Sequence, residues 1–117
     1  MPQSAPFFFA AALLFSGIAA VPTLAADLPG RRVAHDQERG NCLACHRMPA
    51  DPGAETNADM GPALENIRQR YPDRARLRQR IWDARIFDPD TIMPPYGRHR
   101  ILTEEEIDQV VEYVHGL

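Results

Sequence analysis

The clearest hydrophobic pattern in the chain lies close to its carboxyl end. Four apolar side chains recur there at intervals of three and four residues: Ile107, Val110, Val111 and Val114. This spacing is typical of the buried face of an amphipathic helix. Thr103 followed by Glu106 is the sequence signature of a capping box, and Gly116 stands where such a helix would end. The pattern therefore predicts a terminal helix that begins just after Thr103.

Two weaker helical patterns precede it. Leu64, Ile67 and Tyr71 share helical spacing, and Pro72 stops that short helix because proline cannot continue the backbone hydrogen bonds. Asp73 can cap the next helix, since its side chain can accept a hydrogen bond from a first-turn N–H group. The apolar positions of that helix are Leu77, Ile81, Trp82 and Ile86.

The remaining segments predict one more helix and two loops. A short helix from Arg31 to Arg39 is expected, with Gly40 as its carboxyl-terminal cap. Segments 47–63 and 91–100 contain several proline and glycine residues and are expected to be loops. No strand pattern of comparable quality is present in the sequence. The predicted fold class is therefore all-α.

The first 26 residues have a different character. They carry no charged side chain, and the apolar run Phe7–Phe15 is followed by small residues that end in Ala25 and Ala26. This arrangement predicts a secretory signal peptide over residues 1–26, cleaved after one of those alanines. The segment departs from the usual pattern, because no lysine or arginine precedes the apolar run. An uncleaved membrane anchor is the alternative, although Pro22 and the alanines disfavour it.

Residues 27–117 then form the mature protein. We expect one domain, exported to a bacterial periplasm and without a stable membrane span after cleavage. A domain of this length buries little apolar surface, so a large apolar cofactor would supply core that the chain itself lacks. The formal net charge of the chain is −3. Together with export, this acidic balance argues against a nucleic-acid partner.

The candidate chemistry lies in Cys42-Leu43-Ala44-Cys45-His46. Two cysteines separated by two residues and followed at once by histidine are typical of a c-type haem attachment site. The two thiols add to the two vinyl groups of the porphyrin, and the adjacent His46 is then held under the iron as proximal ligand. The motif therefore predicts one haem c, covalently attached through Cys42 and Cys45.

Three other interpretations of the motif are weaker. A structural zinc site needs four ligands, and the chain has no further cysteine to complete one. A thioredoxin-like redox pair would need a surrounding βαβ pattern, which the sequence does not show. A plain disulfide stays open for an exported chain, but it leaves the position of His46 unexplained.

The sixth iron ligand has to reach the opposite face of the ring. Met48 is two residues from His46 and can extend only about 7 Å, too short to pass the ring edge. Met60 precedes a Gly-Pro pair that suits a tight turn near the proximal side better. Met93 lies in a loop that two prolines stiffen, so its thioether would be held at low entropic cost. We therefore predict Met93 as the sixth ligand.

Histidines are the rivals of Met93. His99 lies in the same loop and would give a bis-histidine site of lower potential. An open sixth position would instead allow a gas or a substrate to bind. His35 and His115 are expected at the surface or in the core.

With both ligand loops in view, the chain resembles the class I cytochromes c. An early helix leads into C-x-x-C-H, Gly-Pro precedes a mid-chain helix, a methionine lies in a proline-rich loop, and an amphipathic helix ends the chain. The resemblance implies a small all-α fold wrapped around one haem. It also implies that the carbonyl group of Pro62 accepts the N–H of His46 and fixes its tautomer.

The chain is similar in particular to the SoxX branch, the monohaem subunits of SoxAX thiosulfate-oxidising complexes. The matching segments are Arg39–His46, Gly61-Pro62, Phe87–Gly97 and Ile101–Ile107. Asp88 stands before Pro89 where the branch leads us to expect asparagine, and the loop is shorter than in some members. These departures bear on the subtype and not on haem binding.

The similarity implies a heterodimer with a SoxA-type cytochrome subunit, which would carry out the thiosulfate chemistry. This chain would accept electrons through its haem and pass them to a downstream acceptor cytochrome, with no catalytic residue of its own. It has no spare cysteine for sulfur chemistry. A free-standing electron shuttle, or the cytochrome subunit of another sulfur-oxidising dehydrogenase, is the alternative function.

An arginine-rich stretch lies in the middle of the chain: Arg68, Arg70, Arg74, Arg76, Arg78, Arg80 and Arg85. A solvated helix face is its simplest interpretation. Pairing with haem propionates or with an acidic partner surface is the functional one. Trp82 is expected in the core against the ring, where its N–H could reach a propionate.

Overall fold

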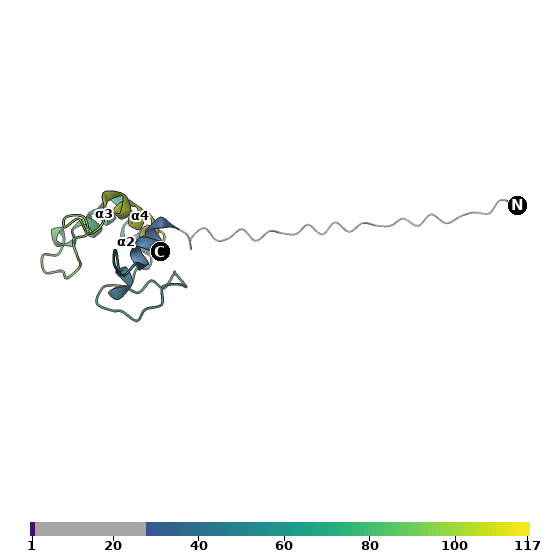
Figure 1. Cartoon of the computed structure of the whole chain (residues 1–117), viewed down its shortest axis with the longest axis horizontal. Coiled ribbons are helices and arrows are strands. Elements are labelled where there is room, and N and C mark those ends of the chain that lie inside the picture. The colour runs from purple at the N-terminus through teal and green to yellow at the C-terminus, as the bar shows by residue number, and fades with distance from the viewer. Residues whose placement is uncertain (2–27) are drawn as a thin grey trace.

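The structure is a computed structural model that describes Met1 and residues 28–117 (Figure 1). The predicted signal peptide and its cleavage site lie outside these described residues. The elements follow in the order α1 (Pro29–His35), the 3-10 turn η2 (Cys42–Ala44), α2 (Ile67–Arg70), α3 (Arg74–Trp82), the 3-10 turn η3 (Ala84–Ile86) and α4 (Glu104–His115). Residues 28–117 contain no strand, so the all-α prediction is confirmed. No helix within that range is long and apolar enough to cross a membrane.

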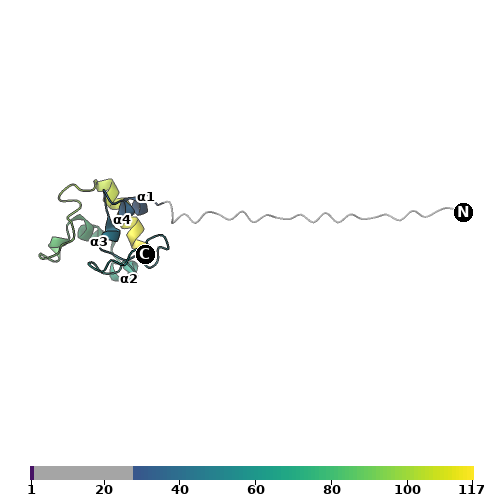
Figure 2. The same ribbon diagram turned by 60° about the horizontal axis from the view of Figure 1, so that its bottom comes forward.

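Helices α1 and α4 pack against each other at the centre of the fold, and α3 lies along α4 (Figure 2). A Cβ atom on Gly30 would overlap the backbone carbonyl of Gln109, so only glycine allows α1 to approach α4 this closely. The whole predicted apolar stripe of α4 is buried, and Val33 and Ala34 of α1 belong to the same core. Burial of this stripe accounts for the stability of α4.

The predicted helix caps are present. The Thr103 hydroxyl accepts the backbone N–H of Glu106 at 3.2 Å, and the Glu106 carboxylate accepts the N–H of Thr103 at 2.9 Å. This reciprocal pair confirms the capping box of α4. The carboxylate of Asp73 accepts the N–H of Ala75 at 2.8 Å and starts α3 as predicted.

The boundaries predicted for the first helix were wrong. The helix begins at Pro29 and ends at His35, instead of extending from Arg31 to Arg39. Proline fits the first turn because the N–H groups there have no helical partner. Gly40 does not cap α1. Its N–H donates to the carbonyl of Val33 at 3.1 Å, and a Cβ on Gly40 would overlap that carbonyl, so glycine is needed there for close backbone approach.

The two middle helices are shorter than the apolar pattern indicates. Helix α2 begins only at Ile67, because Asn66 has a left-handed φ of 53°. Helix α3 ends at Trp82, where the backbone becomes extended at Asp83. The buried carboxylate of Asp83 accepts the backbone N–H of Arg85 at 3.2 Å and its guanidinium at 2.8 Å, which starts the separate turn η3.

Ion pairs join the exposed faces of α3 and α4. Arg78 donates to Glu104 and to Asp108, each at 2.6 Å, and Arg74 pairs with Glu112. Hydrogen bonds to these two carboxylates raise the pKa of Arg78. Part of the arginine-rich stretch therefore forms a solvated, ion-paired helix face, in line with its simplest interpretation.

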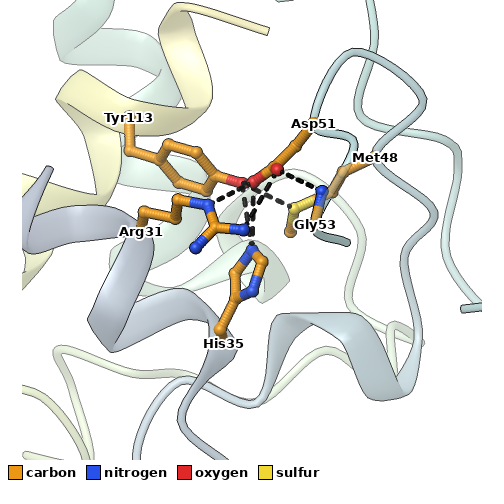
Figure 3. Close-up of polar contacts among 6 residues, drawn as sticks. All are labelled: Arg31, His35, Met48, Asp51, Gly53 and Tyr113. Carbon is orange, nitrogen blue, oxygen red and sulfur yellow. Dashed lines mark hydrogen bonds and ion pairs between the residues drawn. The ribbon is translucent and has the colours of Figure 1, made fainter. Parts of the chain in front are cut away.

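A polar cluster ties the loop 47–63 to α1 and α4 (Figure 3). We call it the Asp51 cluster, and its members are Arg31, His35, Met48, Asp51, Gly53 and Tyr113. The Asp51 carboxylate accepts the Arg31 guanidinium at 2.7 and 3.1 Å, the Tyr113 hydroxyl at 2.5 Å and the Gly53 N–H at 2.9 Å. The sulfur of Met48 lies 3.3 Å from the same hydroxyl.

Burial and the contacts inside the Asp51 cluster shift three pKa values. The hydrogen-bonded guanidinium of Arg31 holds the pKa of Asp51 well below its usual range. Burial, together with the Asp51 carboxylate, raises the pKa of Tyr113. Burial and the charge of Arg31 lower the pKa of His35. The cluster thus holds one carboxylate and one guanidinium as a pair in which each charge has its partner.

Candidate haem site

The C-x-x-C-H motif forms one tight turn at the wall of a cavity. The turn η2 contains Cys42, and the N–H of His46 donates to the carbonyl of Cys42 at 2.9 Å. It begins at Asn41, whose left-handed φ of 46° redirects the chain. Cys42 and Cys45 are both half-buried and unpaired, and both line the cavity. Burial raises the pKa of the Cys42 thiol to about 11, so without a bound group this thiol stays protonated at neutral pH.

His46 is held in one orientation and one tautomer. Its Nδ1 lies 2.7 Å from the carbonyl oxygen of Pro62. A carbonyl oxygen only accepts, so Nδ1 carries a proton, and Nε2 is the ring nitrogen left to bind a metal. Gly61 allows the close approach, because a Cβ atom there would overlap the imidazole ring. The contact between His46 and Pro62 that the resemblance implies is therefore present.

The cavity beside the motif has a volume of about 580 Å³, within the usual range of about 300–1,000 Å³ for ligand pockets. Much of its wall consists of aliphatic side chains from α2, α3 and α4 and the segments beside them: Leu64, Ile67, Leu77, Ile81, Leu102, Val110 and Val114. The residues predicted to hold the haem also line it, namely Cys42, Cys45, His46, Pro62 and Met93. The fold thus brings all the predicted site residues to one apolar space.

Met93 reaches the cavity from a loop that is fastened at two points. The Tyr96 hydroxyl donates to the carbonyl of Gly40 at 2.5 Å, which joins the loop to the segment just before the haem motif. Burial raises the pKa of Tyr96, so its hydroxyl keeps this proton. The N–H of Gly97 donates to the carbonyl of Trp82 at 3.0 Å and fixes the loop to the end of α3. This role of Tyr96 was not predicted, because the sequence shows only an aromatic residue in a proline-rich loop.

The rival histidines are placed away from the cavity or engaged elsewhere. His99 is exposed and is absent from the described residues that line the cavity. Nε2 of His35 lies 3.2 Å from the Tyr113 hydroxyl, within the Asp51 cluster. Nε2 of His115 lies 3.1 Å from the carbonyl oxygen of Tyr71. These positions favour Met93 over a histidine as the sixth ligand.

Two other methionines compete less well with Met93. Met48 is 1% exposed, and its sulfur faces the Tyr113 hydroxyl instead of the cavity. Met60 does line the cavity, but it directly precedes Gly61, which lies against the His46 ring. Its position in the chain next to that glycine disfavours Met60 as a ligand on the face opposite His46.

Trp82 differs from its expected place. It is absent from the described residues that line the cavity, and its indole N–H donates to Glu104 at 3.1 Å. The indole ring instead lies against Gly97, where a Cβ atom would overlap it. Trp82 thus packs against Gly97 in the loop that carries Met93. Three arginines do line the cavity, namely Arg39, Arg70 and Arg80.

The residues present fit a haem c. Two thiols on one turn, an imidazole held through its Nδ1 and a thioether all border a mostly apolar cavity. One polar atom of its wall, Nε of Arg80, is buried and has no hydrogen-bond partner among the described residues. Within residues 28–117 no group of three or more His, Cys, Asp and Glu side chains is placed so that it could hold a metal ion.

Comparison with known families supports the same class of protein, a haem-binding electron-transfer domain. The family model described as Cytochrome c matches residues 29–117. The chain therefore belongs to the cytochrome c family, and haem c is its covalently bound cofactor.

A similar curated protein is an uncharacterized lipoprotein of Aquifex aeolicus (strain VF5). The two chains are 33% identical over 78 residues, which make up 67% of this chain and 37% of the relative. This chain thus spans little more than a third of the relative's length.

Proposed function

We propose that this cytochrome is the electron-accepting subunit of a SoxAX-type heterodimer in thiosulfate oxidation. Within it, Cys42 and Cys45 would attach the haem, and His46 and Met93 would be the iron ligands. The single observation that carries the haem assignment is the cavity on which the C-x-x-C-H turn and the methionine loop converge. The SoxX assignment depends on the sequence similarity of these same two segments.

The chain's own residues prepare the site for electron transfer. Bound haem c supplies a one-electron couple. The hydrogen bond from His46 to Pro62 fixes the ring and makes its other nitrogen a better ligand. A thioether from Met93 would raise the reduction potential relative to a second histidine. The aliphatic walls keep water away from the cavity and so favour the less charged, reduced state.

The edge of the cavity offers a surface for a partner. Three apolar side chains both line the cavity and stay exposed: Met60 at 64%, Ile92 at 75% and Ile101 at 43%. Exposed apolar groups gathered at one site are typical of a protein interface. A permanent subunit contact is expected to be large and apolar, whereas transient docking depends more on charge. This apolar rim therefore favours the stable heterodimer over the free shuttle.

Export to the periplasm belongs to this proposal. Its support is the apolar leader over residues 1–26 and the similarity to a protein described as a lipoprotein. Thiosulfate chemistry would belong to the SoxA-type subunit, because both cysteines of this chain lie in the haem motif.

Co-expression with a SoxA-type subunit tests the proposal. We expect a heterodimer that survives gel filtration at high salt, and reduction of this haem when thiosulfate and the carrier protein are added. A matched variant, Ile92→Glu, should weaken the heterodimer because it places a charge on the apolar rim. A chain that stays monomeric, and whose electron-transfer rate falls steeply with ionic strength, would be a free shuttle instead.

A further inference from the structure

One face of α3 and the turn after it is directed at the haem cavity. Four residues at helical spacing line it: Leu77, Arg80, Ile81 and Ala84. Three of them are apolar and buried, as the wall of an apolar cavity requires. Arg80 is the exception, because it brings a cation to a wall that is otherwise aliphatic.

The three arginines of the cavity wall differ in their partners. Arg39 forms an ion pair with Glu106. Nη1 of Arg70 donates to the carbonyl of Ala63 at 2.9 Å. Arg80 forms neither kind of contact in the described part of the chain, and its Nε is buried there without a hydrogen-bond partner. A buried N–H without an acceptor destabilises the fold, so the site calls for an acceptor.

Aromatic rings hold the Arg80 guanidinium in place. The group lies 4.5 Å from the centre of the Phe87 ring and 6.0 Å from that of Tyr71. The rings supply no hydrogen-bond acceptor oxygen, so these contacts leave the N–H groups of Arg80 in need of one. The planar edge of a guanidinium suits a carboxylate, which can accept two parallel hydrogen bonds.

We propose that Arg80 binds a propionate carboxylate of the haem and compensates its charge. The haem is the group that occupies this cavity, and its propionates are carboxylates. The bound pair would satisfy the buried Nε and would orient the ring in the cavity. A retained positive charge near the iron favours the reduced state, so Arg80 also raises the reduction potential. This role concerns the haem alone and is independent of a SoxA-type partner.

The test compares three variants of the haem-loaded protein. Arg80→Gln removes the charge, and Arg80→Lys keeps it but lacks the planar edge. Arg76→Gln is the matched control, because Arg76 also lies over the Phe87 ring, at 5.5 Å, but is exposed and absent from the described residues of the cavity wall. Mass spectrometry and circular dichroism first verify that each variant carries its haem and is folded.

Two measurements decide the outcome. At a fixed redox-buffer potential, Arg80→Gln should lower the ratio of reduced to oxidised protein about tenfold, which is about 59 mV for one electron. Arg80→Lys should restore most of this ratio, and Arg76→Gln should change it much less. In redox difference infrared spectra, the propionate carboxylate band should shift in both Arg80 variants and not in Arg76→Gln.

Equal effects of Arg80→Gln and Arg76→Gln on the ratio would show a general charge effect and would overturn the proposal. An unshifted carboxylate band in the Arg80 variants would overturn it as well. If Arg80→Gln does not fold, Arg80→Lys decides the question through the infrared band alone.

Discussion

Asp51 and Arg80 are both charged side chains held partly out of water, and their surroundings differ in one respect. The carboxylate of Asp51 accepts hydrogen bonds from Arg31, Tyr113 and Gly53, so the chain itself supplies its hydrogen-bond donors (Figure 3). Arg80 has the aromatic rings of Phe87 and Tyr71 beside its guanidinium, and a buried Nε for which the described residues provide no acceptor.

Charged side chains thus have two roles in this small domain: one stabilises the fold, and the other is directed at the haem cavity. The Asp51 cluster connects α1, the loop 47–63 and α4. It acts on stability because removal of the Asp51 carboxylate leaves the Arg31 guanidinium and the Tyr113 hydroxyl without this acceptor. In the cavity wall, the described residues leave the Nε of Arg80 without an acceptor, and on our proposal a haem propionate would supply it. Substitutions in the two regions should therefore separate into effects on unfolding and effects on the haem.

The largest expected effect comes from loss of the attachment cysteines. Replacement of Cys42 and Cys45 by serine should abolish covalent haem, because a hydroxyl does not form the thioether bond. Mass spectrometry of the denatured wild-type protein should show the polypeptide plus one haem, and the double variant should show the polypeptide alone. Haem that acid–acetone extracts from the wild-type protein would contradict covalent attachment.

Met93→Ala should leave the haem attached and change the coordination of its iron. We expect the weak long-wavelength band of a sulfur–iron bond to disappear from the oxidised spectrum, and the reduction potential to fall, since methionine ligation raises it. His99→Ala is the control and should alter neither property. Loss of the low-spin spectrum in His99→Ala, with Met93→Ala unchanged, would assign the ligand to His99.

Asp51→Ala should lower the stability of the fold and leave the coordination of the haem iron unchanged. Removing one partner of a largely buried ion pair lowers the free energy of unfolding by about 3 kcal/mol, measured by denaturant unfolding. Glu112→Gln is the control, because its exposed pair with Arg74 contributes less than about 1 kcal/mol. Equal losses in the two variants would contradict the special place of the Asp51 cluster.

The same carboxylate predicts a pH dependence. The folded state depresses the pKa of Asp51, so its contribution to stability is fully present above the usual aspartate value near 4 and is lost as the pH falls towards the folded value. The wild-type free energy of unfolding should therefore fall more steeply below about pH 4 than that of Asp51→Asn. Parallel pH profiles would show that Asp51 is not the titrating group.

The smallest expected effect lies outside both regions. Arg100 has a left-handed φ of 56°, which strains a side chain with a Cβ atom. Arg100→Gly should raise the free energy of unfolding by about 0.5 kcal/mol, because relief of strain slightly exceeds the added freedom of the unfolded chain. His99→Gly, at an exposed position without positive φ, should lower it. A lowered stability in both variants would show that the strain is negligible.

Much of the candidate site could be predicted from the sequence, because the patterns that define it involve residues close together in the chain. The C-x-x-C-H spacing fixes three candidate residues on one turn, and the reach of the chain disfavours Met48. The capping box of α4 was likewise predicted from the sequence, because both partners lie within four residues of each other. The family match confirms the haem c that these local patterns predict.

The features that the sequence did not reveal depend on distant partners. Tyr113 is 62 residues from Asp51 in the chain, and no local pattern pairs them. Arg76 and Arg80 stand on one helix in similar sequence surroundings, and only the packing of α3 shows which of them reaches the cavity. Gly40 resembles a helix cap in sequence, yet its role is close approach to the Val33 carbonyl.

The hydrogen bond from Tyr96 to Gly40 also bears on the order in which the holoprotein is assembled. It closes a loop of 56 residues on the chain segment beside the haem motif, and the entropy of that closure must be overcome before the contact forms. The attachment turn, in contrast, involves only neighbouring residues and can form early. A haem joined to the cysteines first would act as a template on which the methionine loop condenses, whereas a loop that had already closed would hinder its entry.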